Sequence, residues 1–301
     1  MTYSTLIYGA GQIAAGYDSP ASGSILTHAH AITSHDDFHL IGFYDINSQS
    51  SKKAAGKWGG RAFEVPVYAD IAVICTPDEA HLDSVRQAAL FSPKLIVLEK
   101  PIARTAEDVR LILEASKGIP VQVNFTRRFV CEFQALAQKI PEYGAFLTGT
   151  GLYGKGFIHN GSHMLDLLRL LVGEVESVRL LSEFSDFYTD DKTKTCLLRF
   201  TSGEFFMRGV DCRHYTVFEL DLCFERARVQ ILDGGKLIKI WKPAHSKEYE
   251  GYVNLAQEDE MITGMDGAMY NLYENVARHL KIGDKLLSPI EGAIVWEIFN
   301  I

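Results

Sequence analysis

Several features are missing from this 301-residue sequence, and each absence excludes a class of protein. The five cysteines are scattered and include no CxxC pair, which argues against a disulfide framework and for reduced thiols. No apolar run approaches the roughly 20 residues that span a bilayer. The first residues, MTYSTLIYGAG, have neither the basic start nor the small-residue cleavage site of a signal peptide. We therefore expect a soluble, cytoplasmic protein with no membrane partner.

An excess of basic residues is also missing. The chain has 30 Lys and Arg against 38 Asp and Glu, a formal net charge of -8, and no local basic cluster. Nonspecific nucleic-acid binding depends on neutralising phosphates with Lys and Arg, so we expect no nucleic-acid partner. Hydrophobic residues make up 47% and charged residues 23%, which is ordinary for a globular protein long enough to hold two domains.

The first half of the chain alternates short apolar runs with helix-forming segments. Thr105 precedes one helical segment and has Asp108 three residues on, which predicts a helix cap. Strands alternating with helices indicate a parallel sheet with helices on both sides. The predicted strands are 4–8, 38–46, 71–77, 95–98 and 120–125, and the predicted helices follow the glycine turn at 9–11 and occupy 50–59, 79–91 and 105–118.

One connection does not fit this alternation. Val65–Tyr68 resembles a strand, yet only Ala69 and Asp70 separate it from the strand that begins at Ile71. A parallel crossover needs about a dozen residues or more. Either Val65–Tyr68 is not a sheet strand, or a helix that usually stands here is absent.

A glycine turn follows the first predicted strand. Gly9-Ala10-Gly11-Gln12-Ile13-Ala14 fits G-x-G-x-x-A, in which Gly9 allows a tight turn and Gly11 a close approach to a pyrophosphate. Asp45, at the tip of the second strand, is placed to bond an adenosine ribose and to repel a 2′-phosphate, which favours NAD over NADP. The spacing to Asp45 is long because Gly16–Ser24 is predicted to be an inserted loop. The alternative interpretation is a packing turn that binds no nucleotide.

The second half has the residue pattern of an antiparallel sheet with one buried face. Val217–Glu225 alternates apolar and polar residues with a period of two, and Asp233-Gly234-Gly235 indicates a hairpin turn. Further strands are predicted at 178–184, 195–200 and 204–210. We therefore predict an α/β chain with a dinucleotide-binding (Rossmann) domain over 1–122. The predicted second domain, over 123–301, is an α+β domain for substrate binding and oligomerisation with a largely antiparallel open sheet.

An acid and a base stand at the end of the apolar run 95–98. Glu99, Lys100 and Pro101 follow it directly, and in an open parallel sheet ligands bind beyond the carboxyl ends of the strands. Pro101 restricts the backbone of Lys100 and is a candidate for a cis bond. A lysine aimed in this way can donate to a substrate oxygen and favour an alkoxide-like transition state. The alternative is a solvated lysine that happens to follow a strand.

Two histidines and an aspartate recur at helical spacing in HNGSHMLDLL. His159, His163 and Asp166 stand at i, i+4 and i+7, so a helix would carry all three on one face. In one interpretation His163 takes a proton from a substrate hydroxyl, for which the ordinary histidine pKa of about 6.5 is suited. In a second the two histidines bind a metal ion, although no Glu follows His159 as in zinc proteases. In a third the three side chains only cap and pack the helix.

Five segments, in this order, resemble the glucose-fructose oxidoreductase/inositol dehydrogenase/MocA family: the glycine turn at Gly9–Gly11, CTPDEAH at Cys75–His81, EKP at Glu99–Pro101, NFTRRF at Asn124–Phe129 and HNGSHMLDLL at His159–Leu168. The resemblance runs over nearly the whole chain. It implies a Rossmann domain followed by an α/β domain whose open sheet often forms dimers or tetramers. It also implies NAD(P)-dependent oxidation or reduction of sugars, polyols or sugar derivatives.

The resemblance further implies roles for single residues. Lys100 matches the lysine of EKP, and His163 matches the histidine assigned as acid/base. The family has an aspartate where His159 stands, so His159 is expected to contact substrate or to share the proton relay. No metal is expected. The cofactor-lining residues expected beyond the glycine turn (Gly9, Gly11, Gln12, Ile13) and Asp45 are Cys75, Thr76, Pro77, His81, Glu99 and Lys100, and the substrate-lining ones are Arg127, Tyr153, Asn160 and His163.

We accordingly predict an NAD-dependent sugar or polyol oxidoreductase that forms a homodimer or homotetramer. Lys100 would polarise the substrate oxygen, and His163 would shuttle the proton. Two alternatives stay open: a noncatalytic protein that binds NAD or a sugar to regulate a partner, favoured by His159 and the missing crossover, and a reductase of a nonsugar carbonyl. For Arg127, binding of a substrate phosphate or carboxylate and snorkelling over the domain joint carry equal weight.

Overall fold

The computed structural model describes residues 2–293, which divide into two compact units. The first comprises residues 2–129 and 266–293, and the second residues 130–265. The predicted boundary at 122/123 therefore falls too early, and the predicted second domain wrongly includes the returning segment 266–293. The reason is packing: the Asn271 side chain donates to the carbonyl of Phe129 at 2.9 Å, so the returning segment joins the first unit. Residues 294–301 of the predicted second domain lie outside the described residues.

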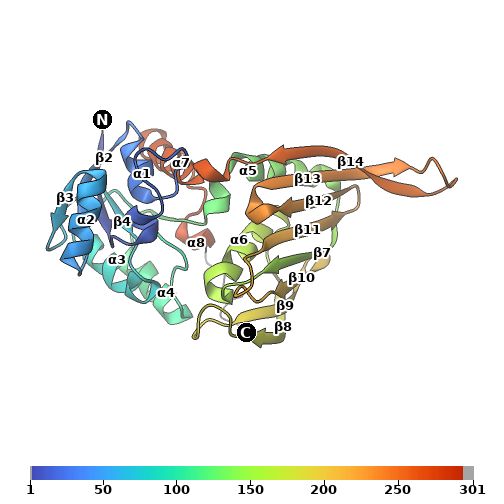
Figure 1. Cartoon of the computed structure of the whole chain (residues 1–301), viewed down its shortest axis with the longest axis horizontal. Helices are drawn as coiled ribbons and strands as arrows, with labels where there is room; N and C mark the ends of the chain where they lie inside the picture. The colour runs from blue at the N-terminus through green and yellow to red at the C-terminus, as the bar shows by residue number, and fades with distance from the viewer. Residues whose placement is uncertain (1, 294–301) are drawn as a thin grey trace. The chain divides into compact units, whose positions relative to one another are not determined.

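Six parallel strands form the sheet of the first unit: β1 (Tyr3–Tyr8), β2 (Phe38–Tyr44), β3 (Arg61–Phe63), β4 (Ile71–Ile74), β5 (Leu95–Leu98) and β6 (Val121–Val123). Their order is β3-β2-β1-β4-β5-β6 (Figure 1), that of a doubly wound dinucleotide-binding sheet. β4 and β5 are buried along their whole length, as strands covered on both faces should be. The predicted fold class is confirmed for this unit.

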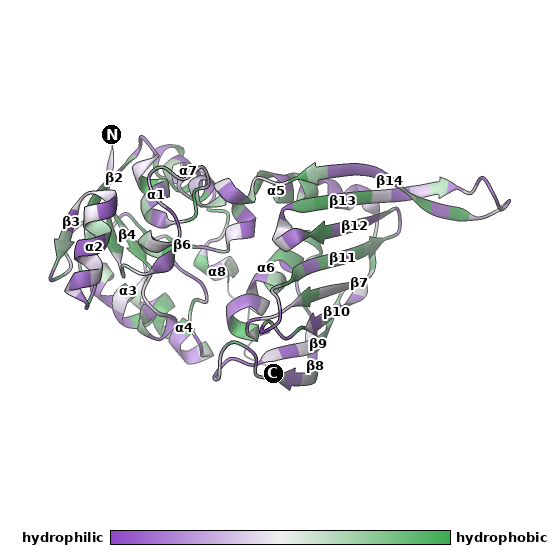
Figure 2. Cartoon of the chain, viewed as in Figure 1, coloured by the Kyte–Doolittle hydropathy of each residue, from purple (hydrophilic) through white to green (hydrophobic). Residues whose placement is uncertain are grey.

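The helices of the first unit follow the predicted alternation. Thr105 accepts a hydrogen bond from the backbone N–H of Asp108 at 3.1 Å, which confirms the predicted cap. Figure 2 shows hydrophilic residues over most of α2 and hydrophobic residues along β4 of the sheet. The helices are α1 (His28–Thr33), α2 (Ser48–Trp58), α3 (His81–Ala89), α4 (Ala106–Ala115), α7 (Ala268–Ile282) and α8 (Ile290–Ala293).

The helix predicted directly after the glycine turn is only a short π-helical turn, η1 (Gln12–Gly16). A loop then runs to the start of α1, in agreement with the predicted insertion. Buried Asp18 anchors this loop, because its carboxylate accepts from the backbone N–H of Leu26 at 2.6 Å and from the Thr27 hydroxyl at 2.6 Å. Asp18 also lies 2.8 Å from Nδ1 of His30. The insertion is thus tied to α1 by one carboxylate.

Residues 64–70 join β3 to β4 without a helix, which accounts for the irregular connection. Arg61–Phe63 is the edge strand. Val65–Tyr68 is not a strand, which was one of the two predicted alternatives. An extended segment of this length spans roughly 20 Å, whereas neighbouring strands lie about 4.8 Å apart. The connection is therefore long enough to pass two strands, and the sheet keeps its order.

The second unit contains an eight-stranded sheet with the order β14-β13-β12-β11-β7-β10-β9-β8 (Figure 1). Only the pair β7 and β10 is parallel, so the prediction of a largely antiparallel sheet is confirmed. Helices α5 (Cys131–Lys139) and α6 (Ser162–Leu171) belong to this unit. The strands are β7 (Phe146–Tyr153), β8 (Ser177–Phe184), β9 (Thr193–Phe200), β10 (Gly203–Gly209), β11 (Phe218–Phe224), β12 (Ala227–Leu232), β13 (Leu237–His245) and β14 (Val253–Ile262).

Two strands of this sheet had no strand signal in the sequence. β7 contains Gly149 and Gly151, where a Cβ would come within 3 Å of the ring of Phe205. Close packing therefore requires glycines that normally weaken a strand. β14 is exposed over most of its length, so it lacks the apolar alternation that marks a half-buried strand. Within residues 2–293, no helix has both the length and the apolar character needed to cross a membrane.

Candidate functional site

The two glycines of the turn after β1 serve different purposes. Gly9 has a φ of +86°, and a Cβ there would meet the carbonyl oxygen of Cys75 at 2.7 Å, so the approach of β4 requires glycine. A Cβ on Gly11 would meet nothing within 4 Å. Gly11 is exposed, so a pyrophosphate has the room that its approach to the backbone requires. The turn therefore fits the phosphates of a dinucleotide.

Asp45 follows β2 and contacts the glycine turn directly. Its Oδ2 accepts the backbone N–H of Ala10 at 2.7 Å, and its Oδ1 accepts that of Asn47 at 2.8 Å. Each carboxylate oxygen can accept more than one hydrogen bond, so these contacts leave capacity for a ribose hydroxyl. The ribose role of Asp45 stays a prediction, and its contact with the turn is a finding.

A pocket of about 370 Å³ lies between the glycine turn and α2. Lys57 donates to the carbonyl of Ala15 at 2.8 Å, which holds its ammonium group at the wall of the pocket. Two lysines on one side make the pocket favourable for an anionic group. The lining residues are Ala10, Gly11, Gln12, Ala15, Gly16, Ser50, Lys53, Ala54 and Lys57.

Glu99, at the end of β5, is the centre of a buried polar cluster. Its Oε1 lies 2.8 Å from Nε2 of His28 and accepts from Nδ2 of Asn124 at 2.6 Å. Its Oε2 accepts the backbone N–H of Lys100 at 3.2 Å. On the other side of the imidazole, Nδ1 of His28 is 2.8 Å from the hydroxyl of Tyr273. Side chains from α1 and α7 thus brace the residue that fixes the backbone of Lys100.

The pKa values in this cluster show where its protons lie. Burial alone would raise the pKa of Glu99, but contacts with His28, Lys100 and Asn124 outweigh it and hold this pKa below its ordinary value. Burial, together with nearby Cys75 and Glu99, raises the pKa of Tyr273 well above its ordinary value. The Tyr273 hydroxyl therefore keeps its proton beside Nδ1 of His28.

Lys100 itself is partly exposed at the carboxyl end of the sheet, where the prediction placed it. Its bond to Pro101 is cis, as the sequence suggested. Neighbouring Cys75, at the end of β4, is buried, and burial raises the pKa of its thiol well above the ordinary value. Cys75 can therefore contribute backbone and shape to the site, but not a thiolate.

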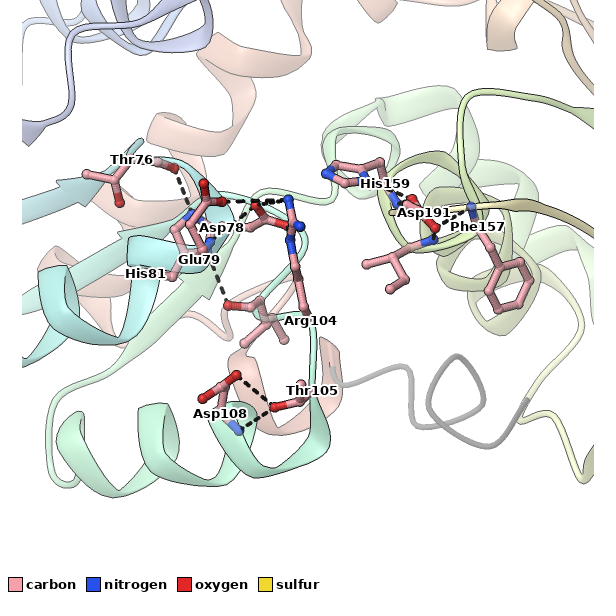
Figure 3. A network of polar contacts seen from close by, with 12 residues as sticks. Thr76, Asp78, Glu79, His81, Arg104, Thr105, Asp108, Phe157, His159 and Asp191 are labelled. Atoms are coloured by element: carbon pink, nitrogen blue, oxygen red, sulfur yellow. Dashed lines mark hydrogen bonds and ion pairs between the residues drawn. The ribbon is translucent and has the colours of Figure 1, made fainter. Parts of the chain in front are cut away.

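The segment after β4 is tied to the loop after β5 (Figure 3). The ring nitrogens of buried His81 lie 3.1 Å from the carbonyl of Ile102 and 3.0 Å from that of Thr76. Burial holds the pKa of His81 below its ordinary value, although the contacts with the carbonyls of Ile102 and Thr76 act in the opposite direction. Asp78 accepts two hydrogen bonds from Arg104, at 2.6 and 2.9 Å. Thr76 and Pro77 stay partly or fully exposed, as residues that line a cofactor would be.

In the second unit, the HNGSH element begins in a π-helical turn, η5 (Phe157–Gly161), that leads into α6. His159 belongs to the turn, whereas His163 and Asp166 belong to α6, so the single α-helical face predicted for all three is interrupted. Asp166 is 1% exposed and His163 is partly exposed. Among residues 2–293, no three or more His, Cys, Asp or Glu side chains are grouped to hold a metal ion.

A carboxylate that the sequence did not indicate holds this turn (Figure 3). Asp191, between β8 and β9, accepts the backbone N–H groups of Phe157, Ile158 and His159, each at 2.9 Å. Its Oδ2 also lies 2.7 Å from Nδ1 of His159. A Cβ on Gly156, whose φ is +83°, would come within 2.1 Å of this carboxylate. The turn and the loop before β9 therefore form one closely fitted structure.

The remaining predicted substrate residues are placed differently. Tyr153 is fully buried, and its hydroxyl donates to the carbonyl of Lys194 at 2.6 Å and accepts the backbone N–H of the same residue. The prediction that Tyr153 lines a substrate pocket is therefore wrong, because packing of β7 on β9 uses the whole side chain. Asn160 donates to the carbonyl of Gly154 at 2.8 Å. Arg127 is partly exposed in η3 (Thr126–Phe129) of the first unit.

The structure thus assembles the candidates within each unit and adds residues that the sequence did not single out. Tyr273 and Glu99 are far apart in the sequence, as are Asp191 and His159. No local pattern marks such partners. The loop between β8 and β9 contains three aspartates, Asp186, Asp190 and Asp191, and the sequence does not indicate which of them contacts His159.

Comparisons with known proteins agree with this fold. Residues 6–125 match the model of an oxidoreductase family with an NAD-binding Rossmann fold. An inositol 2-dehydrogenase of Rhizobium meliloti is 32% identical over 122 residues, 38% of this chain and 37% of the relative. A glucose-6-phosphate 3-dehydrogenase of Bacillus subtilis is 28% identical over 108 residues, 35% of this chain and 31% of the relative. The matched region thus spans about a third of the length of these curated relatives.

Solved structures share the whole architecture. The WlbA dehydrogenase of Bordetella pertussis, in complex with NADH and UDP-GlcNAcA, aligns with a TM-score of 0.76 at 19% identity, over 97% of this chain and 91% of that one. At this identity the likeness shows the fold. Fold, glycine turn and strand tip define a Rossmann-type oxidoreductase scaffold. Residues 6–125 thus match the NAD-binding domain of this oxidoreductase family, and the curated relatives that match the chain are sugar or polyol dehydrogenases.

Proposed function

We propose that the protein is an NAD-dependent oxidoreductase that acts on the hydroxyl or carbonyl group of a sugar, polyol or sugar derivative. The observation that carries the proposal is Lys100 at the carboxyl end of a Rossmann sheet, with its backbone fixed by buried Glu99. The named relatives are dehydrogenases of inositol and of a sugar phosphate, which supports a polyhydroxylated substrate.

The cofactor fits the residues present. Gly11 leaves room for the pyrophosphate, and Asp45 stands at the end of β2 for the ribose. Bound NAD would supply the hydride acceptor or donor. NAD is favoured over NADP because a carboxylate at this position repels a 2′-phosphate.

The chain's own residues supply the polar chemistry. The Lys100 ammonium donates to the substrate oxygen and stabilises the negative charge that develops there. A histidine of the HNGSH element, His163 in the sequence-based assignment, takes the hydroxyl proton during oxidation and returns it during reduction. Arg127 and Asn160 are proposed to contact polar groups of the substrate.

The test is replacement of Lys100 by Ala. Turnover should fall at least about a hundredfold, because the developing alkoxide loses its donor. Fluorescence titration with NADH should give an unchanged Kd, since Lys100 acts on substrate oxygen and not on cofactor affinity. Lys117→Ala, which changes an exposed lysine after α4, is the matched control and should keep most of the turnover. Undiminished turnover of the Lys100 variant would refute the assignment.

Two findings count against the alternative of a noncatalytic binding protein. The sheet order is complete without a helix between β3 and β4, and His159 has a carboxylate partner in Asp191. Binding of NADH without turnover across a broad panel of sugars and polyols would revive this alternative. Turnover of nonsugar carbonyl compounds alone would favour the other alternative, a reductase of a nonsugar carbonyl.

We also propose a homodimer or homotetramer that forms through the sheet of the second unit. Leu147 of β7 and Leu181 of β8 are 51% and 45% exposed on strands of that sheet. Apolar side chains on an open sheet are a common basis for association. Light scattering should show a mass above the 33.6 kDa of one chain, and Leu147→Asp should reduce it. We place the protein in the cytoplasm, where its cysteines would stay reduced.

A further inference from the structure

Asp191 makes more contacts with the HNGSH turn than a helix cap requires. Its side chain is 4% exposed, and its two oxygens accept three consecutive backbone N–H groups of η5. The fourth contact, 2.7 Å to Nδ1 of His159, goes to a side chain. The cap would be complete without it. This contact therefore acts on the imidazole.

The contact selects one of the two neutral forms of His159. A carboxylate that already receives three backbone hydrogens acts as an acceptor, so Nδ1 of His159 carries a hydrogen and donates it. In the neutral ring the lone pair is then on Nε2. The ring plane is fixed as well, because Tyr188 stacks on His159 with centroids 4.0 Å apart and planes 17° apart. Tautomer and orientation are therefore both set.

His159 differs in this respect from a packed histidine. Its side chain is 14% exposed, so a solute can reach it, while its carboxylate partner is shielded. A base within hydrogen-bond reach of an orienting group is the arrangement that activates proton transfer in enzymes. Charged groups close to this turn include Asp186, which accepts the backbone N–H of Lys155, and Lys194, whose ammonium lies over the ring of Phe157.

We propose that Asp191 is a positioning residue that holds His159 with its hydrogen on Nδ1, so that Nε2 of His159 is the proton acceptor in carbinol oxidation. During oxidation the substrate O–H bond breaks, its proton passes to Nε2, and the carbinol carbon becomes a carbonyl as it loses a hydride to the bound oxidant. The proposal rests on the proposed function and moves the role of the base from His163 to His159.

The first measurement needs neither substrate nor cofactor. Long-range proton–nitrogen correlation spectra of protein labelled with ¹⁵N-histidine distinguish the two neutral tautomers, and His159→Gln identifies the signals of His159 among the ten histidines. Above the pH at which the ring is neutral, we expect His159 to carry its hydrogen on Nδ1. Asp191→Asn should change this signature, whereas Asp190→Asn, the same change at the neighbouring exposed position, should not. A neutral ring with its hydrogen on Nε2 in the unmodified protein would overturn the proposal.

The second measurement separates the two histidines in a turnover assay. His159→Gln should lower kcat about a hundredfold or more, and Asp191→Asn should lower it in the same direction. KM for the substrate and the Kd for NADH should stay within a few-fold, because the change affects proton transfer and not binding. Asp190→Asn should keep the unmodified kcat.

The outcomes distinguish this proposal from the proposed function. If His159→Gln keeps its kcat while Lys100→Ala loses it, the enzyme assignment holds and the proton acceptor is not His159. If the unmodified protein turns over no substrate in the panel, the proposed function fails, and the spectra alone decide whether Asp191 positions the ring. An Asp191→Asn variant that does not fold leaves the spectrum of the unmodified protein as the deciding result.

Discussion

Among the buried carboxylates that contact a histidine, Glu99 of the first unit and Asp191 of the second differ most in their surroundings. Glu99 lies 2.8 Å from Nε2 of His28, and Asp191 lies 2.7 Å from Nδ1 of His159. The two pairs are alike in distance but differ in surroundings. His28 is fully buried and its second ring nitrogen meets Tyr273, whereas the side chain of His159 is 14% exposed.

The difference lies in what each carboxylate stabilises. Glu99 contacts side chains of α1 and of the segment after β6. Its contacts therefore join parts of the chain that are far apart in sequence. Asp191 accepts hydrogen bonds from the backbone of a single turn, η5. Its contacts therefore stabilise a local element and orient the ring of His159. Loss of the first pair should chiefly cost stability, and loss of the second should chiefly cost function.

The largest effect on stability is expected from Glu99→Gln. The variant removes the charge from a buried cluster and leaves His28 without an acceptor of the same strength. Breaking a buried ion pair from one side typically costs about 3 kcal/mol or more. Urea denaturation should show this fall in the free energy of unfolding. Glu107→Gln, which changes an exposed partner of Arg110, is the matched control and should change the midpoint little.

The acid limb of the stability curve gives an independent check on Glu99. Its pKa is lower in the folded chain than its ordinary value of 4.5, so the unfolded chain binds more protons near that pH. This contribution is fully present above about pH 4.5 and is lost as the pH falls through the folded pKa. The Glu99→Gln variant should therefore lose less stability than the unmodified protein on acidification below pH 4.5. Parallel curves would mean that the pKa of Glu99 is the same in the folded and the unfolded chain.

A smaller effect is expected from Tyr273→Phe. The variant removes only the hydroxyl that meets Nδ1 of His28 and keeps the buried ring. Loss of one buried hydrogen bond costs about 1 kcal/mol, or somewhat more because Nδ1 of His28 is left without its partner. Tyr270 lies on the same helix and its ring stacks on His35. The variant Tyr270→Phe is the control and should lower the free energy of unfolding by less. Equal costs for the two variants would mean that Tyr273 contributes packing alone.

The sequence was most informative where the signal is local. The apolar run of β5, the glycines after β1 and the Thr105 cap all act within a few residues, and each was predicted correctly. The EKP segment placed Lys100 at the end of a strand because a buried strand and a proline are both local signals.

The sequence failed where a contact depends on the whole fold. Tyr153 looked suited to a polar pocket, but the pairing of sheet strands buries it completely. β7 lacked a strand signal because its glycines are required by side chains that arrive from β10 and β11. Asp191 has no motif of its own, and three aspartates in one loop are equivalent until the chain is folded. Periodicity reports which face is buried, and it does not report which distant residue covers that face.

The smallest effect is expected at a third carboxylate, Asp45, which resembles Asp191 in accepting backbone N–H groups and differs in lying beside the cofactor turn. Asp45→Asn keeps an acceptor for the N–H of Ala10 and removes the charge. If the carboxylate repels a 2′-phosphate, the ratio of the Kd for NADPH to that for NADH should fall about fivefold, the size of one partly screened charge interaction. Fluorescence titration measures both constants, and Asp36→Asn, which changes an exposed aspartate distant in sequence from the turn, should leave their ratio unchanged. A constant ratio in both variants would leave Asp45 with the structural role alone and would move the source of cofactor preference to the lysines of the neighbouring pocket.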